Sequence, residues 1–180
     1  MRAMFFAAVL AAGVFMTVVS AGSQAKPAAP ADPVIVFDTV KGTIEMQLFQ
    51  AEAPKSVAHI LALMKRSFYR GQRFHRVLGS FIQVGDPNSR SMARQDSWGS
   101  GNSGTPIGVF ELSKKRTHVR GAVSLAHAGT PERADSQIFI MKAASPNLNG
   151  VHAVIGRVVT GMAVVDKIVV TDMIKDARVK

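Results

Sequence analysis

The stretch Phe74-His75-Arg76-Val77-Leu78-Gly79-Ser80-Phe81-Ile82-Gln83-Val84 contains two short runs typical of β-strands, separated by the turn residues Gly79 and Ser80. Similar runs occur on both sides of it. Residues 34–49 predict a β-hairpin, because apolar and polar side chains alternate there and Lys41-Gly42 marks a turn. Downstream, further strands are predicted at 121–126, 136–141, 151–158 and within the tail, 171–180.

Two helices are predicted among these strands. Pro54 stands where the first turn of a helix tolerates proline, and apolar residues recur after it at helical spacing, which predicts an amphipathic helix over 53–66. A second, shorter helix is predicted after Gly161. Many short strands, two amphipathic helices and glycine turns indicate a mainly β fold, a closed barrel with helices over its ends. Composition alone is equally compatible with an α+β sandwich.

The polar, glycine-rich segment 87–108 is predicted to be an irregular surface loop. Compact domains seldom keep a loop of this length unless it serves a function or connects strands.

The N-terminal 25 residues have the features of a signal peptide. Arg2 is followed by an uncharged apolar run over 3–19, and small residues follow that run. We expect cleavage after Ala25, with Ala21 as the alternative site; an uncleaved membrane anchor is the other interpretation. The signal looks bacterial, which favours a periplasmic location, with no membrane attachment after cleavage.

The remaining chain divides into a tether and one domain. Residues 26–33 are rich in Ala and Pro and predict a short extended tether, and residues 34–180 predict a single folded domain. The chain has no cysteine, so packing and not disulfides must stabilise it in an oxidising compartment. A monomer is expected, since no feature demands an interface.

Basic residues outnumber acidic ones, with 22 Lys and Arg against 12 Asp and Glu. Such an excess is typical of proteins that bind nucleic acid or anionic surfaces. Here the basic residues are scattered, and the only cluster, Lys114-Lys115-Arg116, is typical of a solvated loop. Nucleic-acid binding is therefore not expected.

Several motifs in this order resemble the cyclophilins, a family of peptidyl-prolyl cis-trans isomerases. They cover nearly the whole chain after the signal peptide: Ala53-Pro54-Lys55-Ser56-Val57, Phe68-Tyr69-Arg70-Gly71, Phe74-His75-Arg76-Val77, Gly121-Ala122-Val123-Ser124-Leu125-Ala126, Ser136-Gln137-Ile138-Phe139-Ile140 and Gly150-Val151-His152-Ala153-Val154-Ile155-Gly156. The resemblance implies an eight-stranded antiparallel closed barrel capped by two α-helices. It also implies proline-containing polypeptides as substrates, and neither cofactor nor metal.

The chemistry of prolyl isomerisation needs no nucleophile. The reaction is slow because amide resonance must be broken, and a donor aimed at the nitrogen of the twisted amide stabilises the transition state. A fixed cation with several donors suits this task, and the resemblance gives it to Arg76.

The resemblance assigns the remaining site residues to substrate binding. Phe81, Phe139 and Leu148 match the apolar pocket for the proline ring, and His152 matches its rim. Gln83 matches a glutamine that binds the substrate backbone and steadies the arginine, and Gln137 a second glutamine near the pocket. The chain preceding the proline is expected to bind, largely through backbone groups, at Ala126 and His127.

The sequence departs from the family pattern in three places. The segment between Arg76 and Gln83 is one residue shorter than in the family. Phe81 therefore occupies either the position of the family's phenylalanine or that of the apolar residue after it. The choice matters because a shift of one residue reverses the face of the strand to which a side chain points. Asn147 replaces an aromatic residue that helps to bind cyclosporin, which predicts weak cyclosporin binding. His127 replaces a common asparagine, and a histidine titrates near neutral pH.

Other functions are less compatible with the sequence. The five histidines lack the spacing of zinc ligands. A hydrolase triad of Ser124, His127 and Asp135 is disfavoured, because Ser124 and His127 fall on opposite faces of a strand and no nucleophile elbow surrounds the serine. The alternative of another class is a weakly active or inactive module that binds proline-containing peptides as a chaperone or scaffold.

Overall fold

The computed structural model describes residues 31–180, so the predicted signal peptide and most of the predicted tether lie outside the described residues. The described part holds eight strands: β1 (Val34–Thr39), β2 (Gly42–Leu48), β3 (Arg76–Val77), β4 (Phe81–Val84), β5 (Ala122–Leu125), β6 (Ile138–Met141), β7 (Val154–Thr160) and β8 (Ile174–Val179). They form one antiparallel sheet in the order β3-β4-β6-β5-β7-β2-β1-β8. The predicted strands are confirmed, with β7 beginning later than expected.

The expected closed barrel is only partly realised. The sheet curls but ends at β3 and β8, which do not pair with each other. The segments just before these two strands approach through an isolated bridge between Arg73 and Met173 and through backbone hydrogen bonds such as Phe74 N to Asp172 O. The sheet is therefore open and curled, because β3 is only two residues long and leaves no ladder for β8 to join.

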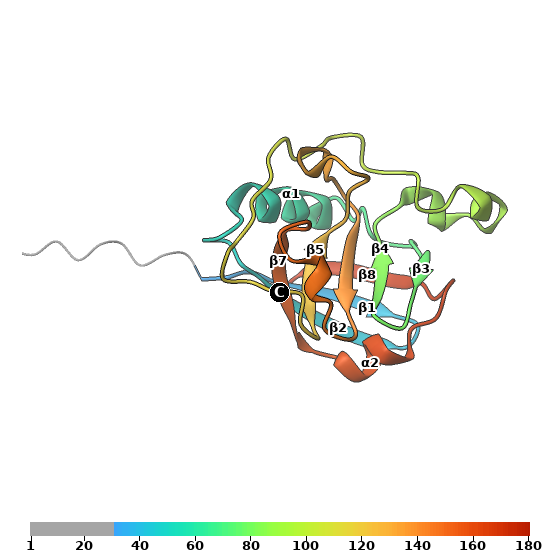
Figure 1. Cartoon of the computed structure of the whole chain (residues 1–180). Helices are drawn as coiled ribbons and strands as arrows, with labels where there is room; N and C mark the ends of the chain where they lie inside the picture. Colours follow the sequence, from blue (N-terminus) through green and yellow to red (C-terminus); the bar gives the residue numbers. More distant parts are fainter. Residues whose placement is uncertain (1–30) are drawn as a thin grey trace, which may run out of the picture.

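Both predicted helices are present, and they cover opposite ends of the curled sheet (Figure 1). In α1 (Pro54–Lys65), Val57, Ile60 and Met64 bury one stripe against the core. No side chain at the N-cap bonds the first turn; instead the Glu111 carboxylate accepts hydrogen bonds from two backbone amides there. The shorter α2 (Met162–Lys167) contacts β2 at the other end. Among residues 31–180, no helix has the length and apolar character needed to cross a bilayer.

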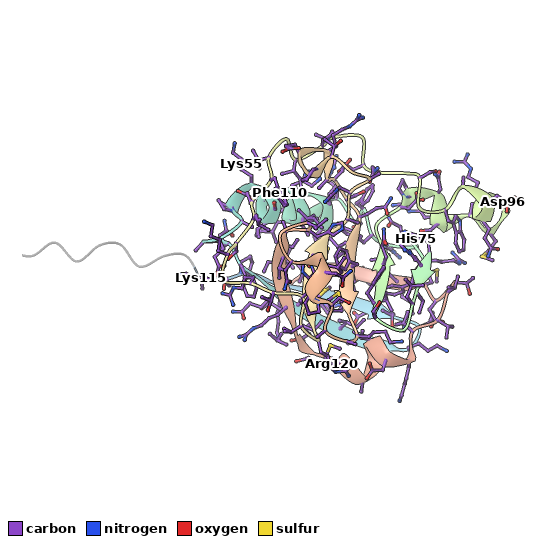
Figure 2. All side chains as sticks on the ribbon, viewed as in Figure 1. Lys55, His75, Asp96, Phe110, Lys115 and Arg120 are labelled. Atoms are coloured by element: carbon purple, nitrogen blue, oxygen red, sulfur yellow. The ribbon has the colours of Figure 1, made fainter. Side chains whose placement is uncertain are left out.

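The loop predicted at 87–108 is more ordered than expected, because it contains the 3-10 helices η1 (Pro87–Arg90) and η2 (Met92–Ser97). The Asp86 carboxylate accepts the backbone N–H of Asn88 and so caps η1. Asp96 lies at the outer tip of this segment, away from the sheet (Figure 2). Two further 3-10 turns, η3 (Pro131–Arg133) and η4 (Pro146–Leu148), interrupt the later connections.

The buried residues form two clusters. The larger fills the inside of the curled sheet and includes residues from α1 and most strands. The smaller surrounds Phe139 and Met141 of β6 with Phe49, and the half-buried Phe81 and Leu148 pack against it. Successive strand residues point to opposite faces, so β6 and β4 contribute one set of side chains to each cluster. The smaller cluster forms the base of a pocket.

Candidate functional site

A pocket of about 200 Å³ opens over the smaller cluster. Its lining comes from β3, β4 and β6, the segment after β5, the turn η4 and His152, which precedes β7. Eight of the nine residues predicted for the site line it together: Arg76, Phe81, Gln83, Ala126, His127, Phe139, Leu148 and His152. The ninth, Gln137, lies behind them.

The register of β4 fixes the position of Phe81. Arg76 pairs with Gln83 and Val77 with Ile82, while Leu78 N bonds Phe81 O across the turn. The short connection is thus a tight hairpin turn, and the strand keeps its alternation: Ile82 enters the main core while Phe81 and Gln83 face the pocket. The Phe81 ring centre lies 5.4 Å from that of Phe139. Phe81 therefore forms the apolar wall of the pocket with Phe139.

Arg76 stands at the mouth of the pocket with its donors free. Its side chain is exposed, and its guanidinium carbon lies 5.0 Å from the centre of the Phe81 ring. Among the described residues it has neither an ion-pair partner nor a side-chain hydrogen bond. A guanidinium held over an aromatic face in this way can donate several hydrogen bonds to a bound molecule.

Two glutamines form a relay behind the pocket. Gln83 Nε2 donates to Gln137 Oε1 at 2.8 Å, and Gln137 Nε2 donates to the carbonyl oxygens of Gly99 and Gly101 at 2.9 and 2.7 Å. Both ends of the Gln137 amide are therefore bonded within the protein. Gln137 orients Gln83, whose side-chain oxygen is left to accept a hydrogen bond from a ligand.

Asp86 holds the segment that carries Gly99 and Gly101 against the site. The Asp86 carboxylate is buried and accepts the backbone N–H of Gly99. A Cβ atom at Gly101 would lie 2.2 Å from Asp86 Oδ1, so only glycine permits this close approach. His75 lies between the β3–β4 hairpin and this segment (Figure 2), and burial lowers the pKa of its imidazole.

Two imidazoles, those of His127 and His152, line the pocket, and a third, that of His118, packs against Phe139 outside the lining. His152 Nδ1 lies 3.0 Å from Leu125 O, and His127 Nε2 lies 2.8 Å from Val151 O. Because a carbonyl only accepts, these two nitrogens carry the protons, and His152 Nε2 presents a lone pair. His118 stacks on Phe139 with ring centres 5.8 Å apart.

Burial lowers the pKa of His152 and of His118, so both rings favour the neutral form. Sequence reasoning missed His118, since only the fold brings its ring onto Phe139.

A second cavity, of about 710 Å³, adjoins the first. It shares Gln83, Ala126 and His127 with the first pocket and adds Gln137 and residues from the 99–106 and 128–135 segments. Sequence reasoning missed this cavity, because loops carry no periodic signal; the unusual length of the 87–108 loop was the one indication.

The remaining candidates lie elsewhere. Asn147 is exposed on η4, next to Leu148, and does not line the pocket. Ser124 is buried in β5 without a hydrogen-bond partner, which leaves no geometry for a hydrolase triad. The described residues include no group of three or more His, Cys, Asp or Glu side chains suited to a metal ion.

Residues 34–180 match the family model described as cyclophilin type peptidyl-prolyl cis-trans isomerase/CLD. A probable peptidyl-prolyl cis-trans isomerase of Brucella suis is 36% identical over 168 residues, which cover 91% of this chain and 85% of that protein. Peptidyl-prolyl cis-trans isomerase B of Bacillus subtilis is 36% identical over 138 residues, 76% of this chain and 90% of that one.

Solved structures agree with the sequence comparisons. A cyclophilin type peptidyl-prolyl cis-trans isomerase of Cryptosporidium parvum superposes with a TM-score of 0.72 at 25% identity, covering 83% of this chain and 98% of that one. A structure of the same protein in the presence of the dipeptide Ala-Pro gives a TM-score of 0.69, at the same identity, over 82% of this chain and 98% of that one.

Proposed function

The chain belongs to the cyclophilin-type peptidyl-prolyl cis-trans isomerase family, and we propose that it accelerates the folding of exported polypeptides, with Arg76 stabilising the twisted X-Pro amide. Its reaction, as the family and its relatives indicate, is the cis/trans isomerisation of prolyl peptide bonds. The uncatalysed barrier is about 18–20 kcal/mol because amide resonance is lost as the bond twists.

Arg76 acts on the nitrogen of the twisting bond. As resonance is lost, that nitrogen becomes pyramidal and gains a lone pair, and a donor aimed at it stabilises the transition state more than the planar ground state. The observation that carries the proposal is the free guanidinium of Arg76 above Phe81, at the mouth of an apolar pocket. Its donors need not leave a protein partner before they reach the substrate.

The rest of the pocket holds the substrate in place. The proline ring packs on Phe139, Leu148 and Phe81, and the oxygen of Gln83 accepts a hydrogen bond from the substrate backbone. No carboxylate lines this pocket, and none is required, since no proton is transferred in the reaction. The chain preceding the proline lies along Ala126 and His127.

Arg76 variants test this assignment. The cis/trans exchange rate of an X-Pro peptide, measured by NMR, gives kcat/KM without a coupling protease. We expect Arg76→Ala to lower kcat/KM about 100-fold, and Arg76→Lys to lower it less, because a lysine keeps the charge but not the planar fork of donors. Arg157→Ala is the matched control, since Arg157 is an exposed arginine on β7 whose side chain bonds only Gln47. Wild-type activity in Arg76→Ala would remove Arg76 from the mechanism.

A catalytically silent module that binds proline-containing peptides is the second candidate. The exposed Asn147, in place of an aromatic residue on the rim, is the observation that favours it. Two observations together would establish this alternative. The wild type would bind the peptide, seen as chemical-shift changes at Phe139 and Leu148, and the X-Pro bond would still exchange at the uncatalysed rate.

We also propose a cellular location for the protein. The apolar leader after Arg2 and the small residues that follow it support export to a bacterial periplasm. Cell fractionation of the full chain expressed in a Gram-negative host, with mass spectrometry of the new N-terminus, tests this. A mature chain starting at Lys26 in the periplasmic fraction is the expected result; a membrane-bound, uncleaved chain contradicts it.

A further inference from the structure

The second cavity continues the binding groove away from the proline pocket. The two hollows meet at Gln83, Ala126 and His127. If the residue before the proline lies on Ala126 and His127, as proposed above, the next residue toward the N-terminus enters the larger cavity. Its side chain then meets residues such as Arg133 that no part of the reaction uses.

Two charged residues line this cavity, and they differ in availability. Asp135 is buried and accepts hydrogen bonds from His59 Nε2 at 2.9 Å, Ser103 Oγ at 2.5 Å, Gly104 N at 3.0 Å and Thr105 N at 3.1 Å. Its oxygens have no position left for a donor from a ligand.

The side chain of Arg133, in contrast to that of Asp135, is available to a ligand. It is the last residue of η3, its side chain is exposed, and it forms no ion pair or side-chain hydrogen bond with the described residues. Its neighbour Glu132 does not line the cavity. Arg76 adds a second free guanidinium in the adjoining pocket. The groove therefore presents unpaired cations to a bound chain, and its one lining carboxylate is already occupied.

We propose that the enzyme prefers polypeptides with an acidic side chain two positions before the proline, and that Arg133 is the residue that recognises it. This inference rests on the proposed function. A glutamate there gains charge-assisted hydrogen bonds to the guanidinium, while a lysine meets like charge and finds no free acceptor. Because Arg133 is exposed, the preference is modest and falls with salt.

The test compares three peptides, acetyl-Ala-Xaa-Ala-Pro-Phe-amide with Glu, Gln or Lys as Xaa, by NMR exchange at low ionic strength. For the wild type we expect kcat/KM to be about tenfold higher for Glu than for Lys, with Gln between them, as two exposed charge interactions of opposite sign imply. Arg133→Glu should reverse the order, and Arg133→Gln should bring the Glu-to-Lys ratio close to one. Arg157→Glu carries the same change of charge on a residue that lines neither cavity, and should keep the wild-type order.

Each outcome bears on one claim. Equal rates for the three peptides with an active wild type overturn the acidic preference but leave the isomerase proposal intact. An equal effect of Arg157→Glu and Arg133→Glu shows that overall charge and not the cavity sets the preference, which overturns the role of Arg133. Absence of catalysis on all three peptides instead refutes the proposed function. Arg133→Gln keeps the test valid if Arg133→Glu does not fold.

Discussion

The imidazole rings of His127 and His152 stand 4.3 Å apart, centre to centre, with their planes inclined by 35°. Each ring is fixed by one bond from a ring nitrogen to a backbone carbonyl. A second proton on His152 would place positive charge against the His127 ring, and no carboxylate lines this pocket to compensate. Burial lowers the pKa of His152, so this ring favours the neutral form.

Stability should therefore fall in mild acid. Burial lowers the pKa of His75, His118 and His152 below the ordinary value of 6.5. As the pH falls through about 6.5, the unfolded chain takes up protons at these histidines before the folded protein does, so the free energy of unfolding decreases. With three such groups the slope is at most about 4 kcal/mol per pH unit.

Urea unfolding between pH 7.5 and pH 5 measures this slope. The carboxylates whose pKa is lowered by arginines, Asp38, Glu52 and Asp166, lose their contribution only at lower pH and stay outside this window. In His118→Asn the amide can replace the bond of Nδ1 to Asn149 without titrating, so the slope should shrink by about one third. A free energy of unfolding that does not change over this range would contradict the burial of neutral rings.

Gln137 should support catalysis indirectly, by holding the loop that carries Gly99 and Gly101 in place. We expect Gln137→Ala to lower kcat/KM about tenfold and the free energy of unfolding by about 1–3 kcal/mol, because Gln83 and two loop carbonyls lose their partners. The Gly99 amide, which donates to Asp86, should exchange with solvent faster as the loop loosens. Gln47→Ala is the control, since Gln47 bonds only an exposed arginine. Unchanged exchange at Gly99 would show that the loop does not depend on Gln137.

Strands such as β2 were predictable because they bury one face. The alternation of Ile44, Met46 and Leu48 with polar residues follows directly from that burial, as does the helical spacing of Val57, Ile60 and Met64 in α1. Whether the sheet closes was not predictable, because closure depends on the length of β3, and two residues leave almost no pattern.

The lining of the smaller pocket was predictable for residues that lie on strands or inside an ordered motif. Phe81 was the uncertain residue, and the register of β4 opposite β6 decides it in favour of the pocket. Arg133 and His118 gave no signal, because their positions depend on the paths of irregular connections. Those paths are set by long-range hydrogen bonds to Asp135, Gln137 and Asn149. A hydrogen bond between residues that are distant in sequence has no period that a single sequence can reveal.

Cyclosporin binding should be weak, because Asn147 stands on η4 where the family resemblance implies an aromatic rim residue. Titration of the purified protein is expected to give a Kd in the micromolar range or above. Asn147→Trp should tighten binding about tenfold, since a Trp at an exposed rim adds apolar contact area to the ligand. Nanomolar affinity of the wild type would show that the rim residue is not needed.

The buried carboxylate of Asp135 should be the most sensitive acidic position in the described domain. Asp135→Asn replaces an acceptor of four hydrogen bonds with an amide whose NH2 faces donors, so one oxygen site becomes repulsive. Since removing one member of a buried charged network costs about 3–5 kcal/mol, the urea midpoint should fall sharply. The matched control is Asp96→Asn at the exposed tip of η2, which should change stability by less than about 0.5 kcal/mol.

Because Asp135 also anchors one wall of the larger cavity, Asp135→Asn should lose discrimination among the three test peptides even at temperatures where it remains folded. Retention of both stability and discrimination would mean that Ser103, Gly104 and Thr105 hold the wall without the carboxylate.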